Sequence, residues 1–242
     1  MKKVTWISLS IIAPLIVSLI VGINDVFAGP PLLCHAIEIG EDVSLPWGDG
    51  TWQSGKITSD DAEFVSQTLA LLSPDVATLT RMETIRRATI HAAEHPKAAG
   101  VLVAALHSRV RDAKSPSATA LFDLGYLSAA YAQMNNVTDH NASGVAGGQR
   151  TELTVPDDIR PYDLVKKSAL MSPYDPAIEF ALALITLSPT HPAHKTHLQN
   201  AVAAASEGSL LAKNIMNRFG NSGQSLSDLR SSFGMVADGE RR

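Results

Sequence analysis

Apolar side chains recur at helical spacing along most of the chain from about residue 58 onward. The clearest stripe lies in 75–94, where apolar residues follow one another at intervals of three: Val76, Leu79, Met82, Ile85 and Ala88. Since three residues make nearly one helical turn, they line one face of a helix. A first helix is predicted near Thr58, and similar patterns predict helices at about 97–112, 117–134, 162–171, 175–187, 192–205, 209–218 and 226–233.

The predicted helix at 117–134 is apolar or small on nearly all sides. A helix of this kind is covered on more than one face, so we expect it at the centre of the fold.

Ser-Pro pairs recur in the helical region, at Ser73-Pro74, Ser115-Pro116, Ser172-Pro173 and Ser188-Pro189. Serine favours the N-cap and proline the first helical position, so each pair is predicted to begin a helix.

Two segments lack a helical period. Residues 29–57 contain repeated Pro and Gly and two tryptophans, Trp47 and Trp52, and are predicted to form an extended arm that these side chains anchor to the helices. A stacking platform for a flat ligand such as a sugar is the alternative role for Trp47 and Trp52.

Residues 135–160 are rich in Asn, Ser, Thr and Gly and are predicted to form a flexible loop. The last residues, 236–242, are predicted to be a frayed tail.

These patterns predict an all-α protein whose helical domain spans 58–235. Short turns between helices favour antiparallel helix pairs, stacked as an α-solenoid or packed as an irregular helical bundle. The spacing Leu121-x-x-Leu124-Gly125-x-x-Ser128 resembles the first helix of a tetratricopeptide unit. This resemblance implies a tetratricopeptide-like array, although the second helix of such a unit does not follow at once.

A second resemblance involves the arm and the helix at 75–94. The runs 29–35, 44–47 and 81–88 resemble those of a group of exported bacterial helical proteins. The resemblance implies an exported helical fold and supplies no mechanism.

The first 28 residues have the order of a secretory signal peptide. Lys2 and Lys3 precede an uncharged stretch at 4–23, and Val26-Phe27-Ala28 offers small residues at the cleavage position. We therefore expect a mature chain that begins at Gly29 and is periplasmic or extracellular. Because about 20 apolar residues can also span a bilayer, anchoring in the inner membrane by residues 4–23 is the alternative.

Charge and cysteine content narrow the possible partners. The formal net charge is −4, which argues against a nucleic-acid partner, since such proteins concentrate Lys and Arg. The chain has a single cysteine, Cys34, so no disulfide can form within it. No haem-attachment motif surrounds Cys34-His35, and no cofactor is expected.

The sharpest chemical motif is His91-Ala92-Ala93-Glu94-His95. It has the H-x-x-E-H form of inverted zinc peptidases, in which two histidines one turn apart hold Zn²⁺ and the glutamate activates water. Pro96 follows at once and ends the helix that should carry both histidines. Glu179 is the nearest candidate for the missing acidic ligand.

A second set of histidines, His191, His194 and His197, spreads over about 120° of a helix surface. Two of them could share a metal ion, and all three could do so less easily. The simpler interpretation is a polar helix start without bound metal.

The sequence therefore favours an exported helical-repeat protein that binds or scaffolds a protein or peptide in the cell envelope. The alternative is a zinc-dependent hydrolase with Glu94 as the catalytic residue and His91 and His95 as ligands. The sequence leaves enzymatic activity open and favours binding.

Overall fold

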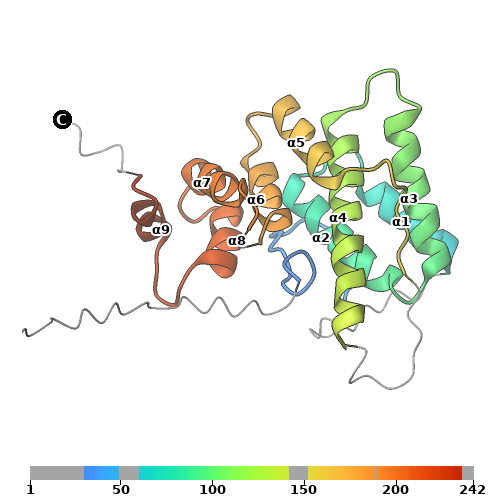
Figure 1. Cartoon of the computed structure of the whole chain (residues 1–242), viewed down its shortest axis with the longest axis horizontal. Helices are drawn as coiled ribbons and strands as arrows, with labels where there is room; N and C mark the ends of the chain where they lie inside the picture. The colour runs from blue at the N-terminus through green and yellow to red at the C-terminus, as the bar shows by residue number, and fades with distance from the viewer. Residues whose placement is uncertain (1–29, 49–59, 142–151, 189, 236–242) are drawn as a thin grey trace, which may run out of the picture.

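The computed structural model describes residues 30–48, 60–141, 152–188 and 190–235, with side chains up to residue 136 in the second range (Figure 1). The predicted signal peptide, Trp52 and the predicted tail lie outside these ranges. Every regular element within them is an α-helix. The helices are α1 (Asp61–Leu71), α2 (Thr78–Ala92), α3 (Pro96–Arg111), α4 (Ala118–Asn141), α5 (Pro161–Met171), α6 (Pro176–Ile185), α7 (His194–Ala204), α8 (Leu210–Phe219) and α9 (Leu226–Ser232).

Helix pairs pack against each other along the molecule. The most extensive contacts join α4 to α5 and α6 to α7, while α1–α3 lie at one end and α9 at the other (Figure 1). The prediction of an all-α fold built from helix pairs is confirmed. No helix in the described ranges is both long and apolar enough to cross a membrane.

Helix α4 lies at the centre, as its apolar circumference predicts. It contacts α2, α3, α5 and α6, and residues 121–130 are all buried. Gly125 allows the closest approach of α5. A Cβ atom at this position would lie 2.8 Å from Val165 Cγ2, 2.9 Å from Leu164 Cβ and 2.9 Å from the Pro161 carbonyl oxygen.

The Ser-Pro pairs at Ser73, Ser115 and Ser172 do not begin helices, and Pro189 of the fourth pair lies outside the described residues. Helix α2 starts at Thr78 and α6 at Pro176, several residues after the respective pairs, and the N-cap of α6 is Asp175. Proline disfavours helical backbone in the residue before it, so these three pairs belong to the turns between helices. The prolines that occupy a first helical position are Pro96, Pro161 and Pro176.

The segment 135–160 is not one continuous loop. Helix α4 extends through its first residues to Asn141, and residues 142–151 lie outside the described ranges. Residues 152–160 pack on the helices, with Leu153 and Ile159 buried. The Asn135 side chain accepts a hydrogen bond from the Leu153 amide (2.9 Å) and donates one to its carbonyl (3.1 Å). The predicted loop is therefore wrong at its start, where α4 continues, whereas residues 152–160 contain no helix or strand and end where α5 begins.

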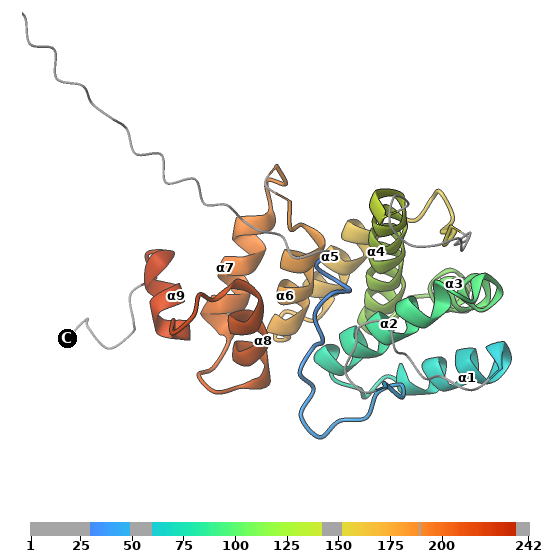
Figure 2. The same cartoon turned by 90° about the horizontal axis from the view of Figure 1, so that it is seen from below.

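Residues 30–48 form an arm without helix or strand that runs between α6–α8 on one side and α1–α2 on the other (Figure 2). Buried Leu32, Leu33, Ile37 and Leu45 join it to the core. Trp47 packs against this core, and the guanidinium of Arg86 lies 4.8 Å from its ring centre. This cation–π contact, together with the packing, anchors the arm as predicted for Trp47.

Polar groups also hold the arm in place. The amide of Ile37 donates to Glu83 Oε2 (2.9 Å), and Arg86 Nη1 donates to the Leu33 carbonyl (3.1 Å). Glu83 is fully buried and accepts further hydrogen bonds from Arg86 Nε (2.8 Å) and Arg87 Nε (2.7 Å). One buried carboxylate thus ties α2 to the arm.

Candidate functional site

The residues of the H-x-x-E-H motif do not share a helix. His91 lies in the last turn of α2, which ends at Ala92, while His95 is the N-cap of α3. Glu94 stands exposed in the turn between them. The continuous helix that gives this motif its geometry in zinc peptidases is interrupted here.

The two imidazoles of the motif stack on each other. Their centroids are 4.3 Å apart and their planes differ by 11°. Because nitrogen lone pairs lie in the ring plane, nearly parallel stacked rings do not direct them at one point. His95 Nδ1 instead pairs with Asp61 Oδ1 at 3.0 Å, and Glu179 contacts His197, not His91.

His91 is enclosed by rings. Its centroid lies 4.4 Å from that of Phe64, and its Nε2 atom is buried without a hydrogen-bond partner among the described residues. Burial, followed by the neighbouring His95, lowers the pKa of His91. The neutral form is therefore favoured, which suits a packed ring of the core.

The second histidine set is divided between two places. His191 and His197 both contact the ring of Tyr162, at centroid distances of 5.3 and 5.7 Å. His194 faces elsewhere, with its Nδ1 atom 3.0 Å from the Ala183 carbonyl oxygen. Within the described ranges no group of three His, Cys, Asp or Glu residues is placed to hold a metal ion.

His197 is the centre of a hydrogen-bonded chain that joins three helices. Its Nε2 atom is 3.0 Å from the Tyr162 hydroxyl of α5, and its Nδ1 atom is 2.8 Å from Glu179 Oε2 of α6. Burial raises the pKa of Glu179, but hydrogen bonds from His197 and Asn200 outweigh this effect and lower it. Both imidazole nitrogens are occupied, so the chain fixes α5, α6 and α7 relative to one another.

An exposed apolar tip is formed by the last residues of α5 and the turn after it. We use this name for Leu170, Met171 and Tyr174, whose exposed fractions are 75%, 46% and 97%. The adjacent turn is held firmly: Asp175 Oδ2 accepts from Thr78 Oγ1 at 2.5 Å, and Asp175 Oδ1 accepts from the Ala177 amide at 3.1 Å. The backbone next to the apolar tip is therefore held in place by hydrogen bonds.

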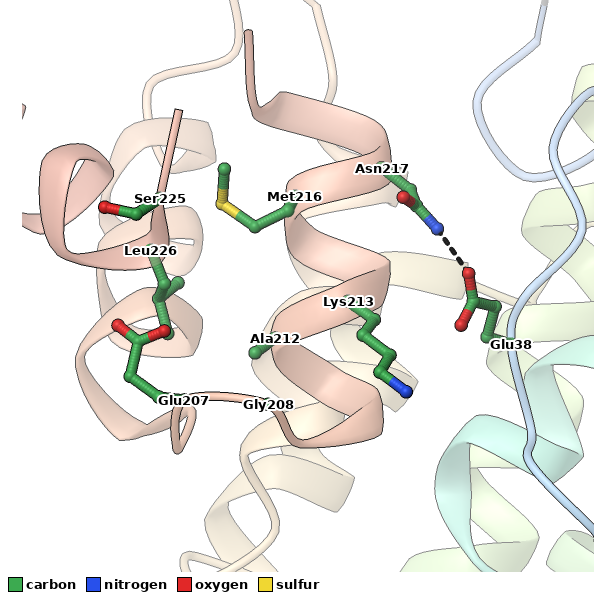
Figure 3. Close-up of a pocket in the computed structure, with 9 residues that line it drawn as sticks. All are labelled: Glu38, Glu207, Gly208, Ala212, Lys213, Met216, Asn217, Ser225 and Leu226. Atoms are coloured by element: carbon green, nitrogen blue, oxygen red, sulfur yellow. Dashed lines mark hydrogen bonds between the residues drawn. The ribbon is translucent and has the colours of Figure 1, made fainter. Parts of the chain in front are cut away.

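A shallow groove of about 300 Å³ lies across α8, between the arm and the start of α9 (Figure 3). Ala212, Met216 and Leu226 provide its apolar lining. Its polar edge includes Glu38, whose Oε1 atom accepts a hydrogen bond from Asn217 Nδ2 at 2.7 Å (Figure 3). The volume is at the lower end of the range for small-molecule sites, which is about 300–1,000 Å³.

Sequence patterns did not reveal the apolar tip or the Tyr162–His197–Glu179 chain. The chain joins residues 18 and 35 positions apart, which no local spacing connects. The apolar tip had one signal, the adjacent pair Leu170-Met171, because an amphipathic helix seldom buries two consecutive side chains equally.

Comparison with known proteins adds no relative. The chain matches no protein-family model, no curated protein and no solved structure.

Proposed function

We propose that this protein is an exported helical scaffold of the cell envelope that binds another protein through the apolar tip at Leu170, Met171 and Tyr174. The observation that carries the proposal is the exposure of three large apolar side chains within five residues. Single exposed apolar residues are ordinary, whereas a cluster is typical of interaction surfaces.

The energetics favour this interpretation. Burying a Leu- or Met-sized side chain contributes about 1.5–3 kcal/mol, so covering the apolar tip supplies a large part of a binding free energy. Tyrosine is enriched among the residues that dominate interfaces, and Tyr174 is the most exposed of the three. Exposed Lys166 and Lys167 on α5 provide the polar surroundings that commonly border an apolar interface core.

The hydrogen-bonded turn beside the apolar tip also supports binding. The hydrogen bond between Thr78 and Asp175 ties the turn to the start of α2. A partner then meets side chains whose backbone is already ordered, which lowers the entropic cost of association.

Photo-crosslinking in the native host tests the proposal. A photoreactive phenylalanine analogue replaces Tyr174 in one variant and Leu170 in another, and Val101 serves as the control. Val101 is 56% exposed but lies on α3, away from the apolar tip. We expect the same discrete protein adduct from positions 170 and 174 and none from position 101. Absence of an adduct, or the same adducts from position 101, would contradict the proposal.

Export is tested separately by intact mass. A mature chain beginning at Gly29 is expected, whereas Met1 retained in the membrane fraction would favour the anchored alternative.

A further inference from the structure

Arg218 is a half-buried cation without a carboxylate partner. It lies in the last turn of α8, and within the described part of the chain its guanidinium makes no hydrogen bond and no ion pair. An unpaired charge taken out of water is costly, and most such groups in proteins have a partner. The five N–H donors of the guanidinium are arranged to bind planar or tetrahedral oxyanions.

Helix geometry places Arg218 against the arm. Asn214, one turn earlier on α8, accepts a hydrogen bond from the Glu38 amide (2.8 Å) and donates one to the Glu38 carbonyl (2.9 Å). Residues four apart share a helix face, so Arg218 lies on the side of α8 that faces the arm, and its charge acts on Cys34 and His35 of the arm. Cys34 and His35 belong to this stretch of the arm, and His35 is exposed.

Tyr126 approaches the same region from α4. Gln133, two turns further along α4, accepts a hydrogen bond from the Leu32 amide of the arm (2.8 Å), and residues seven apart share a helix face. The Tyr126 hydroxyl is fully buried and has no hydrogen-bond partner among the described residues. Burial, together with the Glu83 carboxylate, raises the pKa of Tyr126 far above its usual range, so the hydroxyl remains a donor.

Two guanidiniums, those of Arg218 and Arg86, act on the pKa values of both Cys34 and His35. Burial raises the pKa of the Cys34 thiol, with Arg218 and Arg86 acting in the opposite direction. Burial also lowers the pKa of His35, and the same two guanidiniums lower it further. Arg86 is already paired with Glu83, through Nε and Nη2 at 2.8 Å each, which leaves Arg218 as the cation free to bind a ligand.

We propose that Arg218 and Tyr126 form a binding site for a small oxyanion that carries two neighbouring oxygen atoms, with Cys34 and His35 at its entrance. The guanidinium of Arg218 donates two parallel hydrogen bonds to the anion. The Tyr126 hydroxyl donates a third. A carboxylate and a phosphate monoester both provide this chemistry.

Cys34 provides a specific reporter because it is the single cysteine of the chain. The rate of its alkylation by iodoacetamide is measured at constant ionic strength with increasing acetate, methyl phosphate or chloride. A bound anion covers the thiol and disfavours the thiolate, so alkylation slows. At ten times the dissociation constant only about one site in eleven is free, and the rate is expected to fall about tenfold.

The three anions give different information. Saturable protection by acetate or by methyl phosphate identifies a carboxylate or a phosphate ligand, respectively. Chloride has the same charge as acetate but no paired oxygens and is expected to give no protection. Equal protection by chloride, or no protection by any anion, would overturn the proposal.

Variants assign the effect to Arg218. In Arg218→Gln we expect the dependence on anion to disappear, and in Arg218→Lys we expect weaker protection because the paired donors are lost. Arg111→Gln is the matched control, since Arg111 is exposed and pairs with Asp112 on the far side of the protein's helical array. Protection that persists unchanged in Arg218→Gln would contradict the assignment. Titration calorimetry of the unmodified protein with the protecting anion, expected at one site per chain, does not depend on any variant folding.

Discussion

Gly125→Ala is expected to destabilise the protein, although alanine is the better helix former. In a helix interior, alanine is favoured over glycine by about 1 kcal/mol. Against this gain, the new methyl group would lie 2.8–2.9 Å from three atoms of α5, one a backbone oxygen and another a Cβ. Neither can move without shifting α5 against α4, so the overpacking cost lies at the upper end of the usual range of about 1–3 kcal/mol. The net loss in free energy of unfolding is then about 2 kcal/mol.

Gly100→Ala is the matched control. Gly100 lies within α3, is exposed, and would place its Cβ atom in open space, with nothing within 4 Å. The same change of residue should therefore stabilise the protein by about 0.5–1 kcal/mol. Urea unfolding, followed by circular dichroism at 222 nm, measures both variants. Equal stabilisation of the two would refute the close approach of α4 and α5 at Gly125.

Three further predictions concern polar side chains of α2 and of the turn that follows it. Glu83→Ala leaves the guanidiniums of Arg86 and Arg87 without their carboxylate and is expected to lower the free energy of unfolding by about 3–5 kcal/mol. Glu63 is exposed, so Glu63→Ala is the control and is expected to change this free energy little. Urea unfolding measures both variants. The lowered pKa of His91 means that the unfolded chain binds this proton more readily, so stability falls as the pH drops through 6.5. The fall should be smaller in His91→Phe, and an identical pH profile would contradict it. Finally, dialysed protein is expected to hold no stoichiometric zinc, and Glu94→Gln to leave its properties unchanged; one zinc ion per chain that is lost in His91→Ala would reverse this expectation.

The helical period was sufficient to predict most of the fold. Stripes such as that of α2 depend only on which positions face the core, and the all-round apolar pattern of α4 correctly predicted its central place. Helix ends were less predictable, because Ser-Pro pairs can either begin a helix or lie in the turn before one. In this protein the pairs at Ser73 and Ser172 lie in the turns before α2 and α6.

The segment 135–160 shows why composition alone misleads. Its first residues are polar, yet they continue α4, since a helix already nucleated and packed extends through residues of modest propensity. Leu153 and Ile159 are buried, but two isolated apolar residues in a polar stretch show no period. Their role depends on the tertiary contact with Asn135.

For the candidate sites too, local spacing was visible in the sequence, whereas tertiary placement was not. The H-x-x-E-H spacing was visible in the sequence, but α2 ends at Ala92 and α3 begins at Pro96, which places Glu94 in the turn and His95 at the N-cap of α3. In the described part of the chain, no element covers the apolar tip and no carboxylate pairs with Arg218. A single sequence specifies neither of these features.

The affinity of the protein for the partner captured at position 174 tests the binding function most directly. The double variant Leu170→Ser/Tyr174→Ser removes two apolar side chains from the apolar tip, and Val101→Ser removes one exposed side chain elsewhere. Dominant interface residues contribute about 2 kcal/mol or more each, and 1.4 kcal/mol corresponds to tenfold in Kd. We predict that the double variant binds about 100-fold more weakly or worse, with the Val101→Ser variant unchanged. Equal Kd values for both variants and the unmodified protein would contradict the assignment of the apolar tip as the binding surface.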